Sequence, residues 1–151
     1  MIAERGENFD CVVDASVGIK LFLVEPLSNR ADVLFDRLTD DPPSRFYVPD
    51  LFFIECTNIL WKYVRRFNYP ADAARQDVAD LAQLPLRAVS SAALVDKALA
   101  LAIQHGSTAY DSVYVALAER LSAPLVTADE ALVRRFTGTN LDVHFLGDWP
   151  W

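Results

Sequence analysis

Short apolar runs alternate with longer segments whose apolar residues recur every three or four positions along the chain. The short runs have the length of buried strands, and the longer segments have the period of amphipathic helices. Strands are predicted within 9–16, 45–49, 86–90, 123–129 and 141–146. Helices are predicted at 17–25, 26–40, 50–67, 70–84, 92–106, 107–120 and 130–136. Because strands that alternate with helices form parallel sheets covered on both faces, the pattern predicts an α/β fold with a mainly parallel sheet.

The length of 151 residues fits a single domain over 1–151, with residues 1–9 expected to form a flexible N-terminal tail. No apolar run approaches the roughly 20 residues that a membrane span needs. The polar start of the chain lacks the pattern of a secretory signal. Cys11 and Cys56 lie inside apolar stretches without a C-x-x-C spacing, so we interpret them as reduced core thiols of a cytoplasmic protein.

Acidic residues outnumber basic ones, 21 to 14, which gives a net charge of -7. This balance argues against a protein whose main task is to wrap nucleic acid, because such proteins neutralise phosphates with basic side chains. It does not exclude an enzyme that acts on nucleic acid, since acids gathered at a metal site lower the net charge without making the remaining surface acidic.

Two aspartates follow predicted strands. Asp14 ends the first strand, and Asp129 comes after the fourth. Parallel strands place their ligand site beside their carboxyl ends, so both side chains are candidate site residues. The alternative is that each aspartate caps the helix that follows, a role worth about 1 kcal/mol. Ser16 is an alternative cap for the first helix, which would free Asp14.

Two further acids interrupt apolar helix faces. Glu55 lies one turn into the long helix "LFFIECTNIL" with Asn58 beside it, and Asp111 heads a stripe that continues through Val115 and Ala118. Either the faces border a polar cavity, or the acids are tolerated near helix ends. For Asp111 the second alternative includes first-turn stabilisation, with a preceding Ser or Thr as the cap.

The four acids together favour a metal site. Two carboxylates about 4 Å apart repel by about 4 kcal/mol at an effective dielectric of 20, so gathered acids require protons or a cation. Oxygen ligands select hard ions such as Mg2+ or Mn2+. An ion of this kind can activate water and stabilise charge on a phosphoryl group, which indicates phosphodiester hydrolysis.

The residues around these acids also resemble a known family. The chain is similar to the PIN-domain family, in particular to VapC-type toxins of bacterial and archaeal toxin–antitoxin pairs, over roughly 10–146. Four motifs carry the resemblance, in the family's order: "VVDASVGIKLFLVE", "VPDLFFIECTNIL", "STAYDSVYVALAERL" and "LVTADEALV". The resemblance implies a three-layer α/β/α sandwich with a five-stranded parallel sheet. It also implies a Mg2+- or Mn2+-dependent ribonuclease, a homodimer and capture by a cognate antitoxin.

The resemblance assigns roles to individual residues. By motif, the catalytic and metal-binding acids are Asp14, Glu55, Asp111 and Asp129. Ser16 and Thr127 stand where the family often has a small hydroxyl residue that orients the metal or its water. Asn58 matches a polar position that often follows the glutamate.

Other side chains have weaker signals. The candidate contacts to RNA phosphates are Lys20, Lys62, Arg65 and Arg66. The alternative is that the last three suit the C-terminal dipole of their helix and that Lys20 is plain surface. Arg134 and Arg135 are similarly ambiguous.

Aromatic and histidine residues are interpreted as structural. Tyr110 and Tyr114, which flank Asp111, are predicted to pack in the core, and the remote pair His105 and His144 has no zinc-binding spacing. The long helix at 50–67 has more large apolar residues than one core face needs, so part of it is a candidate interface.

Two alternatives to a ribonuclease remain at this point. One is a non-catalytic, metal-binding PIN-like interaction module. The other is a phosphotransfer protein of the receiver or phosphatase type, which shares an aspartate after the first strand. The phosphatase type requires Asp-x-Asp there, whereas this chain has "DAS" at 14–16.

Overall fold

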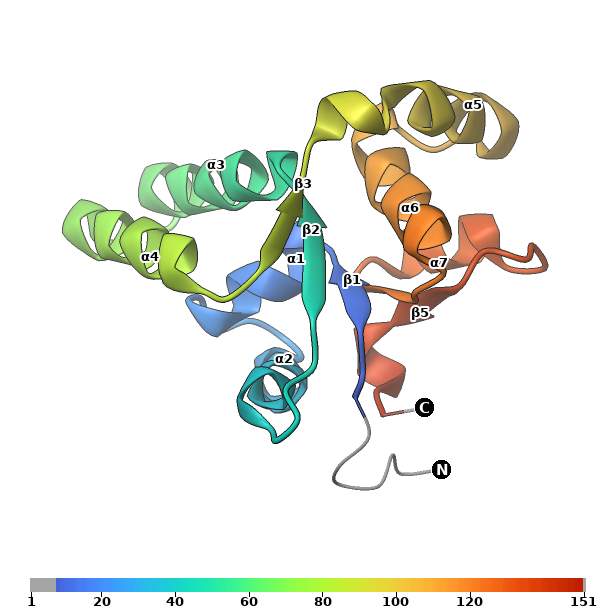
Figure 1. Ribbon diagram of the computed structural model, residues 1–151. Helices are drawn as coiled ribbons and strands as arrows, with labels where there is room; N and C mark the ends of the chain where they lie inside the picture. Colours follow the sequence, from blue (N-terminus) through green and yellow to red (C-terminus); the bar gives the residue numbers. More distant parts are fainter. Residues whose placement is uncertain (1–7, 151) are drawn as a thin grey trace.

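A computed structural model describes residues 8–150 of the chain. Its sheet has five short strands: β1 (Cys11–Val13), β2 (Phe46–Pro49), β3 (Arg87–Val89), β4 (Leu125–Thr127) and β5 (Val143–Phe145). The strand order is β3-β2-β1-β4-β5, and all four pairings are parallel. The first strand is therefore central, and the later strands are added on either side of it (Figure 1).

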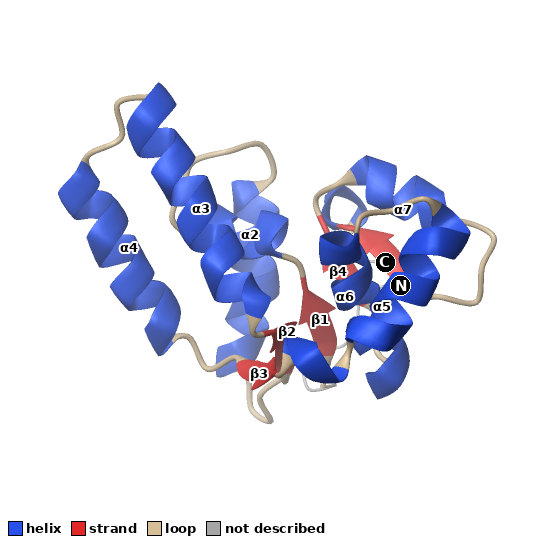
Figure 2. Cartoon of the chain, turned by 90° about the horizontal axis from the view of Figure 1, so that it is seen from above, coloured by secondary structure: helices blue, strands red, loops and turns tan. Residues whose placement is uncertain are grey.

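Helices cover both faces of this sheet. They are α1 (Ala15–Gly18), α2 (Ser28–Asp36), α3 (Leu51–Arg66), α4 (Ala71–Gln83), α5 (Val95–His105), α6 (Ala109–Leu121) and α7 (Glu130–Phe136). Seen from above, α2, α3 and α4 lie on one side of the sheet and α5, α6 and α7 on the other (Figure 2). The predicted three-layer α/β/α arrangement with a five-stranded parallel sheet is confirmed.

The core lies around β1 and α6. Every residue of β1 is fully buried, and so are seven consecutive residues of α6, 112–118. A strand buried on both faces reads as a continuous apolar run, which is why the pattern "CVV" was recognisable as a strand. The helix α6 packs against β1 and β2, so its first turn lies near the ends of these strands.

A glycine sets the distance between α1 and α3. A Cβ atom added to Gly18 would lie 2.5 Å from the ring of Phe52, which is fully buried on α3. Only a residue without a side chain allows this approach. Because Glu55 is one turn after Phe52, the same contact fixes the position of Glu55 relative to the residues that follow β1.

Two predicted helix boundaries are wrong. The helix predicted at 17–25 is α1 followed by a single 3-10 turn, Ile19–Leu21, and Pro26 does not begin the second helix. That helix begins at Ser28, after Leu27 with a positive φ of 71°. The hydroxyl of Ser28 accepts from the Glu25 N–H at 3.0 Å and donates to the Leu23 carbonyl at 3.0 Å. These side-chain bonds replace the backbone bonds of a helix, so the chain turns.

The two ends of the described chain pack together. The predicted tail at 1–9 lies mostly outside the described residues, but Phe9 is held, since its N–H donates to Ser44 Oγ at 2.8 Å. Its ring is 4.5 Å from the ring of Trp149, which is buried. Phe9 therefore belongs to the folded body and not to a tail.

Two further expectations hold within residues 8–150. Cys11 and Cys56 are free and buried, as predicted for core thiols. No helix in this range combines the length and the apolar composition needed to cross a bilayer.

Candidate active site

The four acids meet at the carboxyl edge of the sheet. Asp14 directly follows the central strand β1, and Asp129 lies two residues after the neighbouring strand β4. Glu55 is in the first half of α3, which follows β2, and Asp111 is in the first turn of α6. They lie within electrostatic reach of one another, because the pKa of Asp14 is raised by Asp111, that of Glu55 by Asp14 and Asp111, and that of Asp111 by Asp129.

Asp14 is held by two hydroxyl groups. Ser16 Oγ and Thr127 Oγ1 each donate to Asp14 Oδ2 at 2.7 Å. Asp14 occupies the N-cap position of α1, but its side chain makes no capping hydrogen bond. The alternative in which Ser16 caps this helix is also wrong, since Ser16 Oγ instead accepts from the Ala128 N–H at 3.0 Å. The carboxylate of Asp14 is therefore not committed to the helix.

The surroundings of Asp14 disfavour its charge. The side chain is 6% exposed, and this burial is the main cause that raises the pKa of its carboxyl group. The hydrogen bonds from Ser16 and Thr127 lower the pKa, whereas the charge of Asp111 raises it. The net direction is upward, so burial and the charge of Asp111 outweigh the hydrogen bonds that stabilise the charged form of Asp14.

The pKa of Glu55 is also raised. Burial first, and the charges of Asp14 and Asp111 next to it, raise the pKa of Glu55 from 4.5 to about 7. The hydroxyl of Tyr114 donates to Glu55 Oε1 at 2.7 Å and opposes this rise. A half-buried carboxyl group whose pKa is near neutrality is typical of a functional cleft.

Asp111 is not the cap of its own helix. Thr108 is the N-cap of α6, and its Oγ1 accepts from the Asp111 N–H at 3.1 Å. Burial is the main cause that raises the pKa of Asp111, the charge of Asp129 adds to the rise, and Thr108 and Arg135 oppose it. The alternative of first-turn stabilisation with a preceding Thr as the cap is therefore confirmed, and it is compatible with a role of the Asp111 carboxylate in the site.

Asp129 does cap a helix. Its Oδ1 accepts from the N–H groups of Ala131 at 2.9 Å and Leu132 at 3.3 Å at the start of α7. The capping alternative is therefore confirmed for this residue. Capping uses Oδ1 and leaves a role for the other carboxylate oxygen, so the two interpretations of Asp129 are compatible.

The predicted phosphate contacts lie at different distances from the acids. Lys20 forms an ion pair with Glu25 at 3.3 Å, and its side chain is only 10% exposed. Lys62 is exposed on α3, two turns or about 10 Å beyond Glu55. Arg65 and Arg66 are exposed in the last turn of α3, where Arg65 stacks over the ring of Trp61 at 5.6 Å.

The remaining predicted site residue, Asn58, is exposed on α3. Its side chain makes no hydrogen bond within residues 8–150, whereas Ser16 and Thr127 both contact Asp14. Apart from the basic residues, seven site residues were predicted: the four acids, Ser16, Thr127 and Asn58. The structure places the first six near one another and leaves Asn58 at the surface.

Two residues near the acids were not assigned to the site from the sequence: Tyr114, which was predicted to pack in the core, and Arg135, whose role was left ambiguous. Tyr114 is buried as expected, but its hydroxyl contacts Glu55; its position three residues after Asp111, on the same helix face, was the available signal. Arg135, from α7, is the basic residue whose charge lowers the pKa of Asp111. The prediction that Tyr110 packs in the core is wrong, since Tyr110 is 69% exposed.

Both histidines make contacts that suit a structural role. The ring of His105 packs 4.7 Å from Phe136, and His144 contacts Asp142. Within residues 8–150, no three His, Cys, Asp or Glu side chains lie close enough together to chelate an ion directly. The four acids therefore influence one another's pKa values, but as they stand in the described residues they do not form a chelating group.

The donor set nevertheless fits a divalent cation. Carboxylate and hydroxyl oxygens are the ligands that hard ions such as Mg2+ and Mn2+ prefer. Burial is the main cause that raises the pKa of Asp14, Glu55 and Asp111, and the neighbouring carboxylates add to each rise. A divalent cation held by these oxygens would favour their charged forms.

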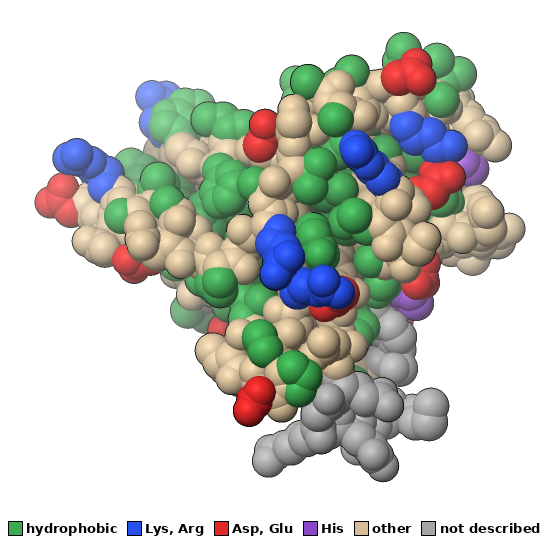
Figure 3. Space-filling model, viewed as in Figure 1, with side chains coloured by type: hydrophobic (Ala, Val, Ile, Leu, Met, Phe, Trp, Pro, Cys, Tyr) green, Lys and Arg blue, Asp and Glu red, His purple; other side chains and the backbone are tan. Residues whose placement is uncertain are grey.

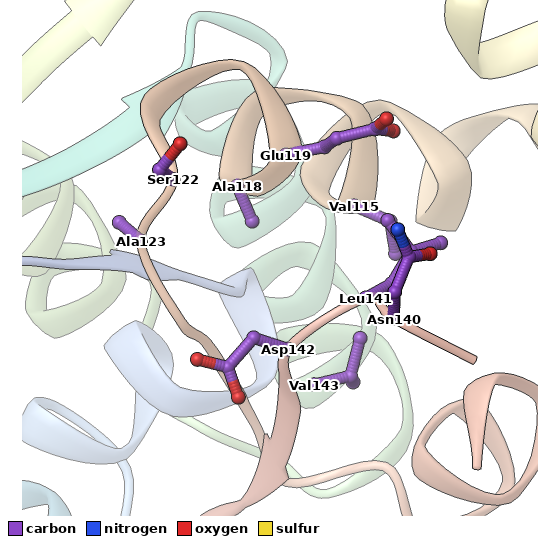
Figure 4. Close-up of a pocket in the computed structure, with 9 residues that line it drawn as sticks. All are labelled: Val115, Ala118, Glu119, Ser122, Ala123, Asn140, Leu141, Asp142 and Val143. Carbon is purple, nitrogen blue, oxygen red and sulfur yellow. The ribbon is translucent and has the colours of Figure 1, made fainter. Parts of the chain in front are cut away.

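A well-formed pocket lies elsewhere. It has a volume of about 330 Å³ and lies between the end of α6 and the chain that enters β4 and β5 (Figure 4). Its lining includes the acids Glu119 and Asp142 but none of the four acids described above. Because the residues before β4 and β5 are at the amino edge of the sheet, this pocket is separate from the candidate site.

The comparisons with known proteins identify the family of the chain. The sequence profile described as the PIN domain matches residues 11–136, a range that contains all four acids, and the chain belongs to the PIN-domain family. The chain is 35% identical over 127 residues to Ribonuclease VapC3 from Pyrobaculum aerophilum, covering 83% of this chain and 93% of that protein.

Solved structures share the fold. The crystal structure of PAE2754 from Pyrobaculum aerophilum matches with a TM-score of 0.68 at 22% identity, covering 92% of this chain and 85% of that one. The crystal structure of VapBC2 from Rickettsia felis, bound to a DNA fragment from its promoter, matches with a TM-score of 0.63 at 12% identity, covering 91% of this chain and 98% of that one.

Proposed function

We propose that the chain is a Mg2+- or Mn2+-dependent endoribonuclease, the toxin of a toxin–antitoxin pair, acting in the cytoplasm. The observation that carries this proposal is the group of mutually repelling carboxylates, Asp14, Glu55 and Asp111, at the carboxyl edge of the sheet. The name of the relative VapC3 supports the reaction, and the solved toxin–antitoxin complexes of the same fold support the setting.

The acids and the hydroxyl residues of the site have different proposed roles. Asp14, Glu55, Asp111 and Asp129 would hold the ion, and Ser16 and Thr127 keep the carboxylate of Asp14 in place from two neighbouring segments. A bound divalent ion supplies an activated water and positive charge for the phosphoryl group.

Basic side chains would bind the RNA. Lys62 lies on the same helix as Glu55 and Arg135 lies near Asp111, so these two can meet phosphates on either side of the acids. Arg65 and Arg66, farther along α3, would extend the contact along the strand. Lys20 would have to leave its ion pair with Glu25 to take part.

The first test is cleavage of cellular RNA by purified protein with Mg2+ or Mn2+. The variant Asp14→Asn removes the charge of Asp14 but not its volume, and Asp32→Asn, exposed on α2, is the matched control. We expect discrete products from the wild type and the control, and none from Asp14→Asn or in EDTA. Full metal-dependent activity of Asp14→Asn would show that the site is assigned wrongly. Metal binding without cleavage of any RNA would favour a non-catalytic module.

Asp14 is poorly suited to the phosphotransfer alternative. An aspartate that accepts a phosphoryl group must be open to in-line attack, yet Asp14 is 6% exposed and accepts two hydroxyl hydrogen bonds on Oδ2. Labelling with acetyl phosphate is therefore expected to leave the protein unmodified.

Two exposed apolar surfaces suit the proposed partners, a second copy of the chain and a cognate antitoxin. On α5, Val95, Leu99 and Ile103 are 55%, 57% and 75% exposed and form one stripe with a spacing of four residues. Between α3 and α4 lies an apolar groove of about 430 Å³ that includes Leu60 and Trp61. Hydrophobic side chains gather over both regions in Figure 3.

We assign the stripe on α5 to the homodimer and the groove to the antitoxin. A straight stripe on one helix can pair with its own copy about a two-fold axis, because the same residues are presented by both chains. A concave apolar groove instead suits an amphipathic helix of a different chain.

A further inference from the structure

A buried tyrosine connects the two helices that hold Glu55 and Asp111. Tyr114 has no exposed surface, and its hydroxyl donates to Glu55 Oε1 at 2.7 Å. Tyr114 belongs to α6 and Glu55 to α3, so the bond joins the helix layers on the two sides of the sheet (Figure 2). Within residues 8–150, it is the one side-chain hydrogen bond between α3 and α6.

Core packing alone does not explain this hydroxyl group. A phenylalanine ring would fill the same space, and a buried phenol requires a hydrogen-bond partner that a phenylalanine does not. The partner of Tyr114 is not a backbone carbonyl but a half-buried carboxylate that the proposed metal site uses. The hydroxyl group therefore acts on the site as well as on the core.

The bond also opposes a force that would move Glu55. A glutamate has three rotatable side-chain bonds, and the carboxylates of Asp14 and Asp111 are close enough to act on that of Glu55. Without an anchor, the carboxylate would gain by turning toward solvent. The hydrogen bond from Tyr114 holds it beside the two aspartates.

We propose that Tyr114 is a positioning residue for the metal ion, because its hydroxyl keeps the Glu55 carboxylate in place before the ion arrives. The inference rests on the proposed metal-dependent function. Hydrogen-bond partners of metal ligands typically change metal affinity or activity by about 10- to 100-fold when they are removed. Tyr114 contacts neither the ion nor the RNA in this role and acts through Glu55.

The test compares two variants that each lose one tyrosine hydroxyl. Tyr114→Phe removes the bond to Glu55, and the matched control Tyr69→Phe removes a bond of the same type to Asp77, away from the four acids. The measurements are Mn2+ affinity by calorimetry, RNA cleavage as a function of Mn2+ concentration, and the melting temperature in EDTA.

We expect Tyr114→Phe to weaken Mn2+ binding by about tenfold or more and to raise the Mn2+ concentration for half-maximal cleavage by the same factor. Cleavage at saturating Mn2+ should return toward the wild-type rate, because the ion itself then holds Glu55. Tyr69→Phe should bind Mn2+ and cleave RNA as the wild type does.

A second variant pair separates positioning from a general effect on the fold. In a Glu55→Gln background, Tyr114→Phe should cause no further loss of Mn2+ affinity, because its target is gone. An equal loss in both backgrounds, or wild-type Mn2+ affinity in Tyr114→Phe, would overturn the positioning role and leave the metal site intact. Absence of Mn2+ binding by the wild type would overturn the proposed function and this inference with it.

Discussion

Removing the charge of Glu55 should make the metal-free protein more stable. Folding raises the pKa of this carboxyl group from 4.5 in the unfolded chain to about 7. A group whose pKa is raised by folding stabilises the protein below the lower value, and this stability is lost as the pH rises through the higher value. Glu55→Gln cannot ionise, so it should keep the stability that the wild type loses between about pH 4.5 and 7.

The magnitude follows from the same two values. The rise from 4.5 to about 7 corresponds to about 3 kcal/mol at about 1.36 kcal/mol per pKa unit. Glu55 is only half buried, and solvent screening reduces the effect, so we expect about 1–2 kcal/mol. For a chain of this length, that is an increase in melting temperature of about 3–6 °C.

The assay is thermal unfolding of both proteins with EDTA and with Mn2+, at about pH 5 and about pH 8. In EDTA, the variant should be more stable at the higher pH and equal to the wild type at the lower one. In Mn2+ at the higher pH, the wild type should be the more stable protein, because it has the Glu55 carboxylate to bind the ion and the variant does not. If Glu55→Gln were no more stable than the wild type in EDTA at about pH 8, the argument from burial and repulsion would be wrong.

Two further predictions concern the packing of the helices. Gly18→Ala should destabilise the protein by about 1–3 kcal/mol, since its Cβ would lie 2.5 Å from the Phe52 ring and α3 would have to shift. Chemical denaturation measures the free energy of unfolding of both proteins. An unchanged free energy of unfolding would show that the Phe52 ring moves aside freely. Leu99→Glu places a charge in the apolar stripe of α5 and should convert a dimer to monomers in light scattering, whereas Trp61→Glu in the groove should leave the dimer intact. A dimer that survives Leu99→Glu but not Trp61→Glu would reverse the two assignments.

The sheet and the positions of Asp14 and Asp129 beside it could be predicted from the sequence, because each depends on a local pattern. "CVV" and "LVT" are uninterrupted apolar runs, and an aspartate after such a run is conspicuous whether it caps a helix, as Asp129 does, or not, as with Asp14. The carboxyl ends of parallel strands then bring these residues together without any knowledge of the loops.

The features that were missed depend on side-chain contacts and packing that apolar periodicity does not reveal. Apolar periodicity continued past Leu21, but the side-chain bonds of Ser28 to Leu23 and Glu25 decide where the chain turns. The partner of the Tyr114 hydroxyl could not be predicted, because Glu55 lies 59 positions away in the sequence and meets Tyr114 only through the packing of α3 and α6. Tyr110 was wrongly placed in the core because only the packing of α6 shows that this side chain faces solvent.

The central position of β1 has a consequence for the newly made chain. The first acid, Asp14, follows this strand, but its hydroxyl partner Thr127 and the last acid, Asp129, come from β4 and its loop, which is synthesised more than 100 residues later. Chains emerge from the ribosome N-terminus first, so the early strands and helices can form while the set of acids is still incomplete. Under the proposed function, a nascent or truncated chain that ends before β4 would therefore lack part of the catalytic site. RNA cleavage would begin only when the whole chain has folded, at which point the proposed antitoxin can also bind the finished fold.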